Sequence, residues 1–248
     1  IFDNIFVQPA AGDNGGALGA AFHVYNSILN KERKYEMKSA LLGPEFSNNQ
    51  IEKFLKISKI NYRKSDDICK ETAQFLSKGK IIGWYQSRME FGPRALGSRS
   101  ILADPTNPKM KDRINSYVKF REEFRPFTPS VKSESASIYF NLDFISRFML
   151  FVFPVRDKYK EKLPAITHVD GTARVQCVDK SIQPKYWKLL DEFEKIKDFP
   201  VLLNTSFNIM GEPIVYSPDQ AIRCFYGSGI DTLIIGDFIV EKNEKNNS

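Results

Sequence analysis

Apolar residues along this chain recur either at helical spacing or in short continuous runs. Between residues 66 and 78 they recur every three or four positions, which predicts an amphipathic helix with Ser65 or Asp66 as its cap. The run from Lys80 to Tyr85 has the length and composition of a buried strand. The same reasoning predicts further helices over residues 16–29, 51–59, 109–118, 185–197 and 218–226, and strands over residues 5–7, 148–155, within 166–178, 200–203, 232–235 and 238–241. Strands that alternate with helices and end in an antiparallel pair predict a mixed α/β (α+β) sheet domain from about residue 66 onward.

Composition and charge narrow the possible partners. The 248 residues suffice for one domain, or one domain plus a fragment of another, and the net charge of +6 suits anionic ligands. Three widely spaced cysteines and the absence of a signal peptide predict reduced thiols in a cytoplasmic protein. Two histidines are too few for a self-contained histidine-rich metal site. The longest apolar run, Phe148 to Val155, is too short to span a membrane, so we expect no membrane partner.

Candidate chemistry is densest between Gly83 and Asp104, where the predicted strand ends and a loop follows it. Within this loop three arginines lie near one carboxylate, namely Arg88, Arg94, Arg99 and Glu90. Guanidinium groups offer paired donors that match the oxygens of phosphate or carboxylate. The alternative is a set of solvated charges, but Gly92, Pro93 and Gly97 constrain the backbone and favour a built anion site.

A second candidate segment runs from Thr167 to Gln176. Arg174 lies in an otherwise apolar strand and needs an anionic partner, which is either a ligand or a structural carboxylate. His168 stands two residues from Asp170, which suggests a catalytic pair, but a histidine that is hydrogen-bonded at a strand end is the commoner arrangement.

Two further segments carry polar residues beside predicted elements. Asn204, Ser206 and Asn208 follow a buried strand, where α/β sheets usually bind ligands, although Asn and Ser are also ordinary turn residues. Glycines around Asp13 precede a helix, so this turn is a candidate phosphate site, and Asp13 is either a metal ligand or a helix cap.

Five segments, taken together and in order, resemble the NodU/CmcH-type O-carbamoyltransferases: Pro9–Ala21, Gly83–Pro105, Phe120–Val131, Ala165–Gln176 and Leu203–Val215. In that family a Kae1-like domain of the actin/Hsp70 ATPase type precedes a YrdC-like domain with a twisted mixed sheet and flanking helices. The chain begins at Ile1 without Met, and we expect the C-terminal part of a longer protein. The resemblance implies a Kae1-like remnant over residues 1–45, a linker over 46–65, a YrdC-like domain over 66–242 and a frayed tail over 243–248.

The resemblance also implies a reaction. In the family, the YrdC-like domain binds carbamoyl phosphate and ATP and forms a carbamoyl-adenylate, with Mg²⁺ as a candidate cofactor. The Kae1-like domain then transfers the carbamoyl group to a hydroxyl of a small-molecule alcohol or sugar, using a metal such as iron. Asp13 matches the aspartate ligand of the family, but the histidine ligands have no counterpart in this sequence. We therefore expect iron only in a full-length protein, and we expect this chain alone to lack the complete transfer site.

By the same resemblance, the candidate catalytic residues are Arg94, Arg99 and Arg174. The candidate residues for carbamoyl phosphate and ATP are Arg88, Glu90, Lys119, Arg121, Arg125, Asn204, Ser206 and Asn208, with Glu90 expected to orient an arginine. One alternative is a YrdC/Sua5-like enzyme that makes threonylcarbamoyl-adenylate for tRNA, which the Gly-Pro-Arg-Ala-Leu-Gly block opposes. Another is a non-catalytic basic module that binds anions or nucleic acid. Because the aromatic residues lie in apolar runs, we do not expect nucleic acid as a partner.

Overall fold

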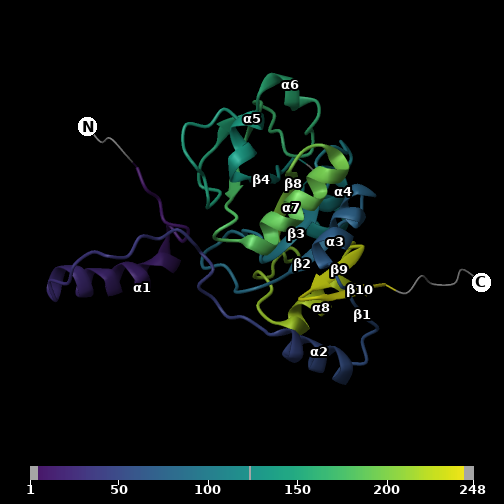
Figure 1. Ribbon diagram of the computed structural model, residues 1–248, viewed down its shortest axis with the longest axis horizontal. Coiled ribbons are helices and arrows are strands. Elements are labelled where there is room, and N and C mark those ends of the chain that lie inside the picture. The colour runs from purple at the N-terminus through teal and green to yellow at the C-terminus, as the bar shows by residue number, and fades with distance from the viewer. Residues whose placement is uncertain (1–4, 123, 243–248) are drawn as a thin grey trace, which may run out of the picture.

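An eight-stranded mixed sheet forms the centre of the molecule in the computed structural model, which describes residues 5–122 and 124–242 (Figure 1). Its strands, in spatial order, are β1 (Arg63–Lys64), β10 (Phe238–Glu241), β9 (Thr232–Ile235), β2 (Ile82–Tyr85), β3 (Arg99–Ala103), β8 (Val201–Ser206), β4 (Thr128–Lys132) and β7 (Gln176–Val178). Neighbouring strands are antiparallel except for the parallel pairs β2–β9 and β4–β7. A separate two-stranded ladder joins β5 (Phe153–Pro154) and β6 (Thr172–Ala173).

Helices cover both faces of the large sheet. One face packs against α3 (Ile68–Ser77) and α7 (Pro184–Lys197), which also pack against each other. The core on the other face includes residues of α2 (Asn48–Ile57), α4 (Met110–Ile114), the π-helical η2 (Asn115–Lys119), α5 (Ala136–Tyr139) and α8 (Pro218–Tyr226). The short elements η3 (Ser133–Ser135) and α6 (Asp157–Lys160) complete the described helices of this part.

Two apolar cores result from the alternation of side chains along the strands. Leu202 belongs to the core beneath α3 and α7, whereas Leu203 belongs to the core on the opposite face. Leu102 and Ala103 divide between the two cores in the same way. Strands of this sheet are therefore buried on both faces, which explains their short continuous apolar runs.

Most of the predicted helices and several strands are confirmed. The elements α8, β9 and β10 have the predicted bounds, and α2, α3, α4 with η2, α7, β2 and β8 lie within a few residues of theirs. The predicted caps of α3 are wrong, because Asp67 accepts a hydrogen bond from the Lys70 amide at 3.2 Å.

Three strand predictions differ from the structure. The strand expected over 148–155 is reduced to β5, because Met149 has a φ of +54° that interrupts an extended chain. Residues 5–7 form no strand. The segment 166–178 forms two short strands, β6 and β7, and the central strands β3 and β4 were not predicted.

Part of the expected linker, residues 46–65, is built into the sheet domain. Ile51 and Leu55 of α2 are buried in its core, and β1 pairs with β10. The expected tail, residues 243–248, lies outside the described residues.

The N-terminal helix extends away from the sheet (Figure 1). It consists of α1 (Asp13–Phe22), continued by the π-helical η1 (His23–Ile28), so the helix predicted from residue 16 begins three residues earlier. Its apolar side chains Val24, Tyr25 and Ile28 are exposed. This helix therefore presents an apolar surface that the described part of the chain does not cover.

Candidate functional site

A polar patch occupies one end of the sheet face that α7 covers elsewhere. Residues directly opposite each other in a sheet share a face, and three such pairs here are polar on both sides. The pairs are Ser100 with Ser206, Thr128 with Asn204, and Ser130 with Gln176. Two residues before Asn204 along β8, the same face carries the apolar side chain of Leu202. The sheet thus changes from apolar to polar at this end.

The loop between β2 and β3, which carries Arg88 and Arg94, lies over this patch. The Asn204 amide donates to Ser130 Oγ at 2.9 Å and to Gln176 Oε1 at 3.0 Å, and it reaches the Ala95 carbonyl at 3.4 Å. The Gln176 amide donates to the Leu96 carbonyl at 2.7 Å. Asn204 is 1% exposed. The buried Tyr186 hydroxyl of α7 lies within reach of the Asn204 and Ser130 side chains, so it belongs to the same polar patch.

Glu90 shapes the loop through backbone contacts. Its Oε1 accepts hydrogen bonds from the amides of Leu96, Ser98 and Arg99 at 2.7, 2.6 and 3.2 Å. Among the described residues it forms no ion pair with an arginine, so it orients the peptide chain of the loop instead of a guanidinium. Glu90 is buried, which makes these charge-assisted bonds strong.

Gly97 allows the loop to pass close to α7. Its φ is +102°, and a β-carbon added there would lie 2.2 Å from the ring of Tyr186. Only glycine satisfies both the backbone conformation and the close approach.

Arg174 lies beside this patch, within electrostatic range of Arg94. Neither forms an ion pair with a carboxylate among residues 5–122 and 124–242, and the Nε atoms of both are buried without a partner. Arg174 Nη2 donates to the Thr128 hydroxyl at 3.2 Å. Burial, and then the charge of Arg94, lower the pKa of Arg174 to about 10. Two guanidinium groups without a carboxylate partner are a candidate site for an anion.

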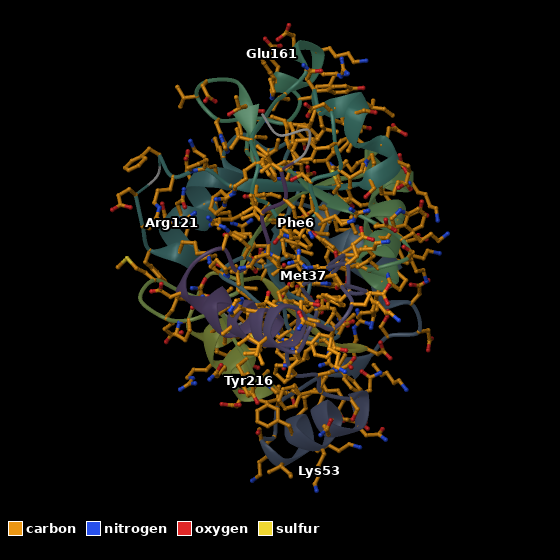
Figure 2. The ribbon with its side chains drawn as sticks, turned by 90° about the vertical axis from the view of Figure 1, so that its left-hand side faces the viewer. Phe6, Met37, Lys53, Arg121, Glu161 and Tyr216 are labelled. Atoms are coloured by element: carbon orange, nitrogen blue, oxygen red, sulfur yellow. The ribbon has the colours of Figure 1, made fainter. Side chains whose placement is uncertain are left out.

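A second cationic cluster lies at the end of β8. Lys119 donates to Ser206 Oγ at 3.2 Å and to Asn208 Oδ1 at 2.6 Å. Arg121 donates to the Asn115 side chain at 2.8 Å, and its guanidinium lies 4.9 Å from the centre of the Phe127 ring. Phe127 directly precedes Thr128 of the polar patch. Arg125 is exposed and lies 3.9 Å from the Glu122 carboxylate. Figure 2 shows Arg121 at the edge of the molecule.

The remaining candidates lie elsewhere. Arg99 is fully buried on the opposite face of β3 from Ser100, where it stacks 3.7 Å above the Tyr85 ring and donates to the Gln86 carbonyl at 2.6 Å. Burial lowers its pKa, and its Nε and Nη2 have no described partner. Arg88 is exposed and donates to the Leu42 carbonyl at 3.1 Å.

Asp13 and His168 show no metal-site geometry. Asp13 is exposed in the first turn of α1, and the described residues hold no group of three or more His, Cys, Asp or Glu side chains that suits a metal ion. The residues present therefore do not fit a bound iron. His168 is half-buried beside the Thr172 hydroxyl, and burial lowers its pKa.

Sequence reasoning missed four residues of the patch, Ser100, Thr128, Ser130 and Gln176. Thr128 and Ser130 alternate with apolar neighbours in Phe-Thr-Pro-Ser-Val, which is a weak strand signal interrupted by proline. Gln176 ends the segment that was singled out for Arg174 and His168. Its role follows only from its pairing with Ser130 across β7 and β4.

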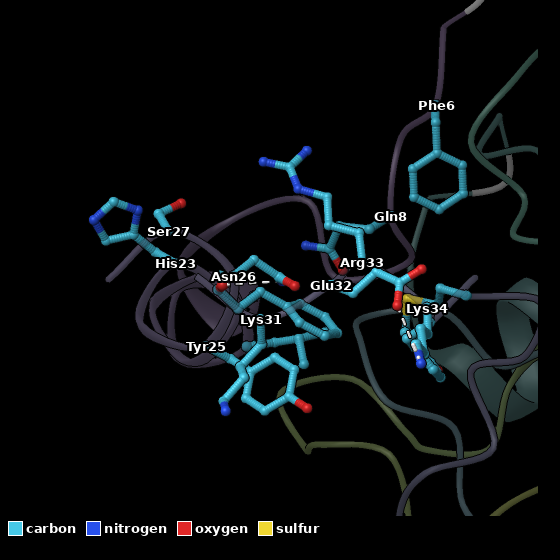
Figure 3. A pocket seen from close by; sticks show the side chains of 16 residues that line it. Phe6, Gln8, His23, Tyr25, Asn26, Ser27, Lys31, Glu32, Arg33 and Lys34 are labelled. Carbon is cyan, nitrogen blue, oxygen red and sulfur yellow. Dashed lines mark hydrogen bonds and ion pairs between the residues drawn. The ribbon is translucent and has the colours of Figure 1, made fainter. Parts of the chain in front are cut away.

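Cavities lie both beside this site and far from it. A hollow of about 400 Å³ adjoins His168 and is lined in part by Phe124 and Pro126. A larger one, of about 960 Å³, lies between the N-terminal helix and residues 31–37 (Figure 3). Its walls include Phe6 and Tyr25, and it lies apart from the polar patch, so we assign the chemistry to the cationic clusters.

Comparison with known proteins gives a consistent result. Residues 73–242 match the family described as Carbamoyltransferase C-terminus. The chain is 46% identical over 248 residues to nodulation protein NolO of Bradyrhizobium diazoefficiens, covering 98% of this chain and 45% of that protein. It is 43% identical over 269 residues to the uncharacterized protein sll1178 of Synechocystis, covering 97% and 44%. Against nodulation protein U of Rhizobium tropici the identity is 36% over 228 residues, covering 92% and 37%.

The fold also resembles a solved structure. The P. abyssi Sua5 structure complexed with L-threonine superposes with a TM-score of 0.51 at 19% identity, covering 68% of this chain and 46% of that one. The chain spans less than half the length of the curated relatives named above. No helix among the described residues is long and apolar enough to cross a membrane.

Proposed function

The chain belongs to the carbamoyltransferase family, whose C-terminal domain it matches, and from this membership we propose that it binds carbamoyl phosphate and ATP and forms a carbamoyl-adenylate. In this proposal water cleaves carbamoyl phosphate to carbamate and phosphate, and the carbamate oxygen then attacks the α-phosphorus of ATP and displaces pyrophosphate. The carbamoyl group then goes to a hydroxyl of a small-molecule alcohol or sugar. The observation that carries the proposal is the pair Arg94 and Arg174, which influence each other electrostatically and form no ion pair with a carboxylate in the described part of the chain.

Carbamoyl phosphate suits this site in charge. Its phosphate would be held by the two guanidinium groups, which supply paired donors. Its planar amide would lie toward the polar patch, whose hydroxyl and amide groups can hydrogen-bond to it. A site that binds both ends of carbamoyl phosphate would distinguish it from inorganic phosphate, which would contact only the two arginines.

The second cluster gives ATP a place beside the first ligand. Lys119 and Arg121 would hold its phosphates, and the hollow beside His168 offers room for the rest of the nucleotide. Positive charge from both clusters would offset the repulsion between the two anions and stabilise the charge that develops in the transition state. Mg²⁺ that enters with ATP would add to this effect.

The N-terminal residues fit the proposed domain division. Residues 1–45 would be the end of a Kae1-like domain, since the exposed apolar helix and its 960 Å³ groove call for a protein surface to cover them. Iron and the acceptor alcohol would bind with the part of the relatives that this chain does not span, and Asp13 would contribute to a metal site only together with that part. We therefore propose that this chain carries out adenylation and not transfer.

Adenylation is tested by measuring the release of pyrophosphate from ATP in the presence of Mg²⁺. We expect release that depends on carbamoyl phosphate and is lost in Arg94→Ala and Arg174→Ala. Arg223→Ala, an exposed arginine on α8, is the matched control and should behave as wild type. Release that requires L-threonine in place of carbamoyl phosphate would instead support a Sua5-like reaction. Salt-dependent binding of RNA without pyrophosphate release would support a basic binding module.

A further inference from the structure

The loop between β2 and β3 is bound by residues 40–44 as well as by the polar patch. Backbone hydrogen bonds join the two segments in antiparallel order: Phe91 N–H to Ala40 C=O at 2.6 Å, Gly43 N–H to Met89 C=O at 2.9 Å, and Met89 N–H to Pro44 C=O at 2.9 Å. The Arg88 side chain adds its bond to the Leu42 carbonyl. Residues 40–44 therefore pair with the stretch of the loop that leads to Arg94.

Two glycines allow the N-terminal part of the chain to approach this loop closely. A β-carbon added to Gly43 would lie 2.8 Å from the Met89 carbonyl oxygen. A β-carbon added to Gly92, whose φ is +118°, would lie 2.7 Å from the Pro9 carbonyl oxygen. A carbon and an oxygen cannot pack at these distances, so both contacts require glycine. The loop thus touches two N-terminal segments, residues 9–10 and 40–44, which we call the contact segments.

The same loop is anchored to the polar patch two residues beyond Arg94. Leu96 belongs to one buried apolar cluster with Ala40 of the contact segments. Its carbonyl accepts hydrogen bonds from the side chains of Gln176 and Gln183, both at 2.7 Å. Arg94 therefore lies between a stretch that is paired with the contact segments and a residue that is bound to the sheet and α7. The position of Arg94 depends on both attachments.

We propose that the contact segments position the loop for oxyanion binding, with Pro9 and Ala40 as positioning residues that act through the loop on Arg94. This inference rests on the proposed function, because the oxyanion is the carbamoyl phosphate of that site. By linkage, an anion held by Arg94 stabilises the contacts between the loop and the contact segments in return. The oxyanion site is then complete only when residues 9–10 and 40–44 are docked on the loop.

Gly43→Ala tests the positioning role. Gly43 has no positive φ, so alanine there crowds the Met89 carbonyl without straining its own backbone. The matched control is Gly19→Ala in α1, where the added β-carbon meets nothing within 4 Å. In calorimetric titration, the affinity for carbamoyl phosphate should weaken by about tenfold in Gly43→Ala, equivalent to the loss of one charged hydrogen bond, and stay unchanged in Gly19→Ala. A merely structural role would lower the melting temperature and leave Kd unchanged.

Hydrogen exchange of the wild type measures the reciprocal effect, and it decides the matter if Gly43→Ala does not fold. At a hundredfold excess of carbamoyl phosphate over Kd, the amides of Gly43, Met89 and Phe91 should exchange at least about tenfold more slowly. The amides of Ser58 and Lys59, which end α2, serve as the internal control and should keep their rates. Arg94→Ala should show no such protection at the same ligand concentration.

The outcomes separate this inference from the proposed function. Wild-type protein that binds carbamoyl phosphate with unchanged exchange at the three amides overturns the positioning role and leaves the anion site intact. An unchanged Kd in folded Gly43→Ala does the same. Protection that persists in Arg94→Ala overturns the assignment to Arg94. No binding of carbamoyl phosphate by the folded wild type removes the proposed function and this inference together.

Discussion

Replacing Arg174 by methionine should stabilise the empty domain and abolish ligand binding. Burial and Arg94 lower the pKa of Arg174 from its ordinary value to about 10, so the folded state opposes its charge. Each pKa unit corresponds to about 1.4 kcal/mol, which sets an upper bound of about 3 kcal/mol. Because the side chain is only half-buried, screening by solvent reduces this to about 1–2 kcal/mol.

The variant also loses the hydrogen bond to Thr128, which offsets part of that gain by about 0.5–1 kcal/mol. We therefore expect the free energy of unfolding to rise by roughly 1 kcal/mol without ligand, or about 2–4 °C in the melting temperature. At a hundredfold excess over Kd, carbamoyl phosphate should stabilise the wild type by about 2.7 kcal/mol and the variant hardly at all.

Urea denaturation of the wild type and of Arg174→Met, with and without carbamoyl phosphate, measures whether the ligand reverses their order of stability. Arg223→Ala serves as the control and should follow the wild type in both conditions. A variant that is less stable than wild type in the absence of ligand would refute the reasoning, because Arg174 would then be compensated by partners within the protein.

Three further predictions follow from the loop and from Lys119. Glu90→Ala should lower the free energy of unfolding by about 3 kcal/mol, because three buried amides lose their acceptor. Glu90→Gln keeps an acceptor and should lower it by less. Thermal denaturation of both variants measures this difference. Gly97→Ala should destabilise by at least about 2 kcal/mol more than Gly79→Ala, because both have positive φ but only Gly97 meets the Tyr186 ring; equal losses in chemical denaturation would contradict the proposed fit. The folded pKa of Lys119 is lowered to about 7, so the stability of the ligand-free protein should rise as pH increases from about 7 toward 10.5, and Lys119→Met should flatten that rise in denaturation midpoints measured across this range.

The helices and strands that were predicted correctly are those in which apolar residues occupy every position that faces the core. Helix α8 and strands β9 and β10 lie in the core and contain few polar interruptions, so their pattern suffices. Strands β3 and β4 were missed because polar residues replace apolar ones where the two strands carry the patch. The strands that local pattern fails to indicate are therefore those that position the candidate site.

The site itself was only partly predictable. Arg174 in an apolar segment requires an anionic partner on physical grounds alone, but the choice between ligand and carboxylate depends on what the fold brings near it. The structure places Arg94 there, and the pairing across β4, β7 and β8 that brings this about is long-range. Likewise, the side chain of Arg99 lies on the face opposite to the patch because it alternates with Ser100 along β3, and the sequence does not reveal which face each residue takes.

The predicted family is confirmed by the match over residues 73–242, and the predicted mixed sheet with flanking helices is observed. The domain division, the ligands and the roles of individual arginines stay predictions. These depend on occupied sites and on a part of the relatives that this chain does not span.

Calorimetric titration with carbamoyl phosphate, with inorganic phosphate as the reference ligand, tests the central claim most directly. Our account predicts saturable binding of carbamoyl phosphate that is tighter than that of phosphate, is lost in both Arg94→Ala and Arg174→Ala, and is retained in Arg223→Ala. Each charged hydrogen bond that is removed should cost about 1.5–3 kcal/mol of binding free energy. Unchanged affinity in both arginine variants, in samples that melt cooperatively, would contradict the account, because the anion would then bind elsewhere.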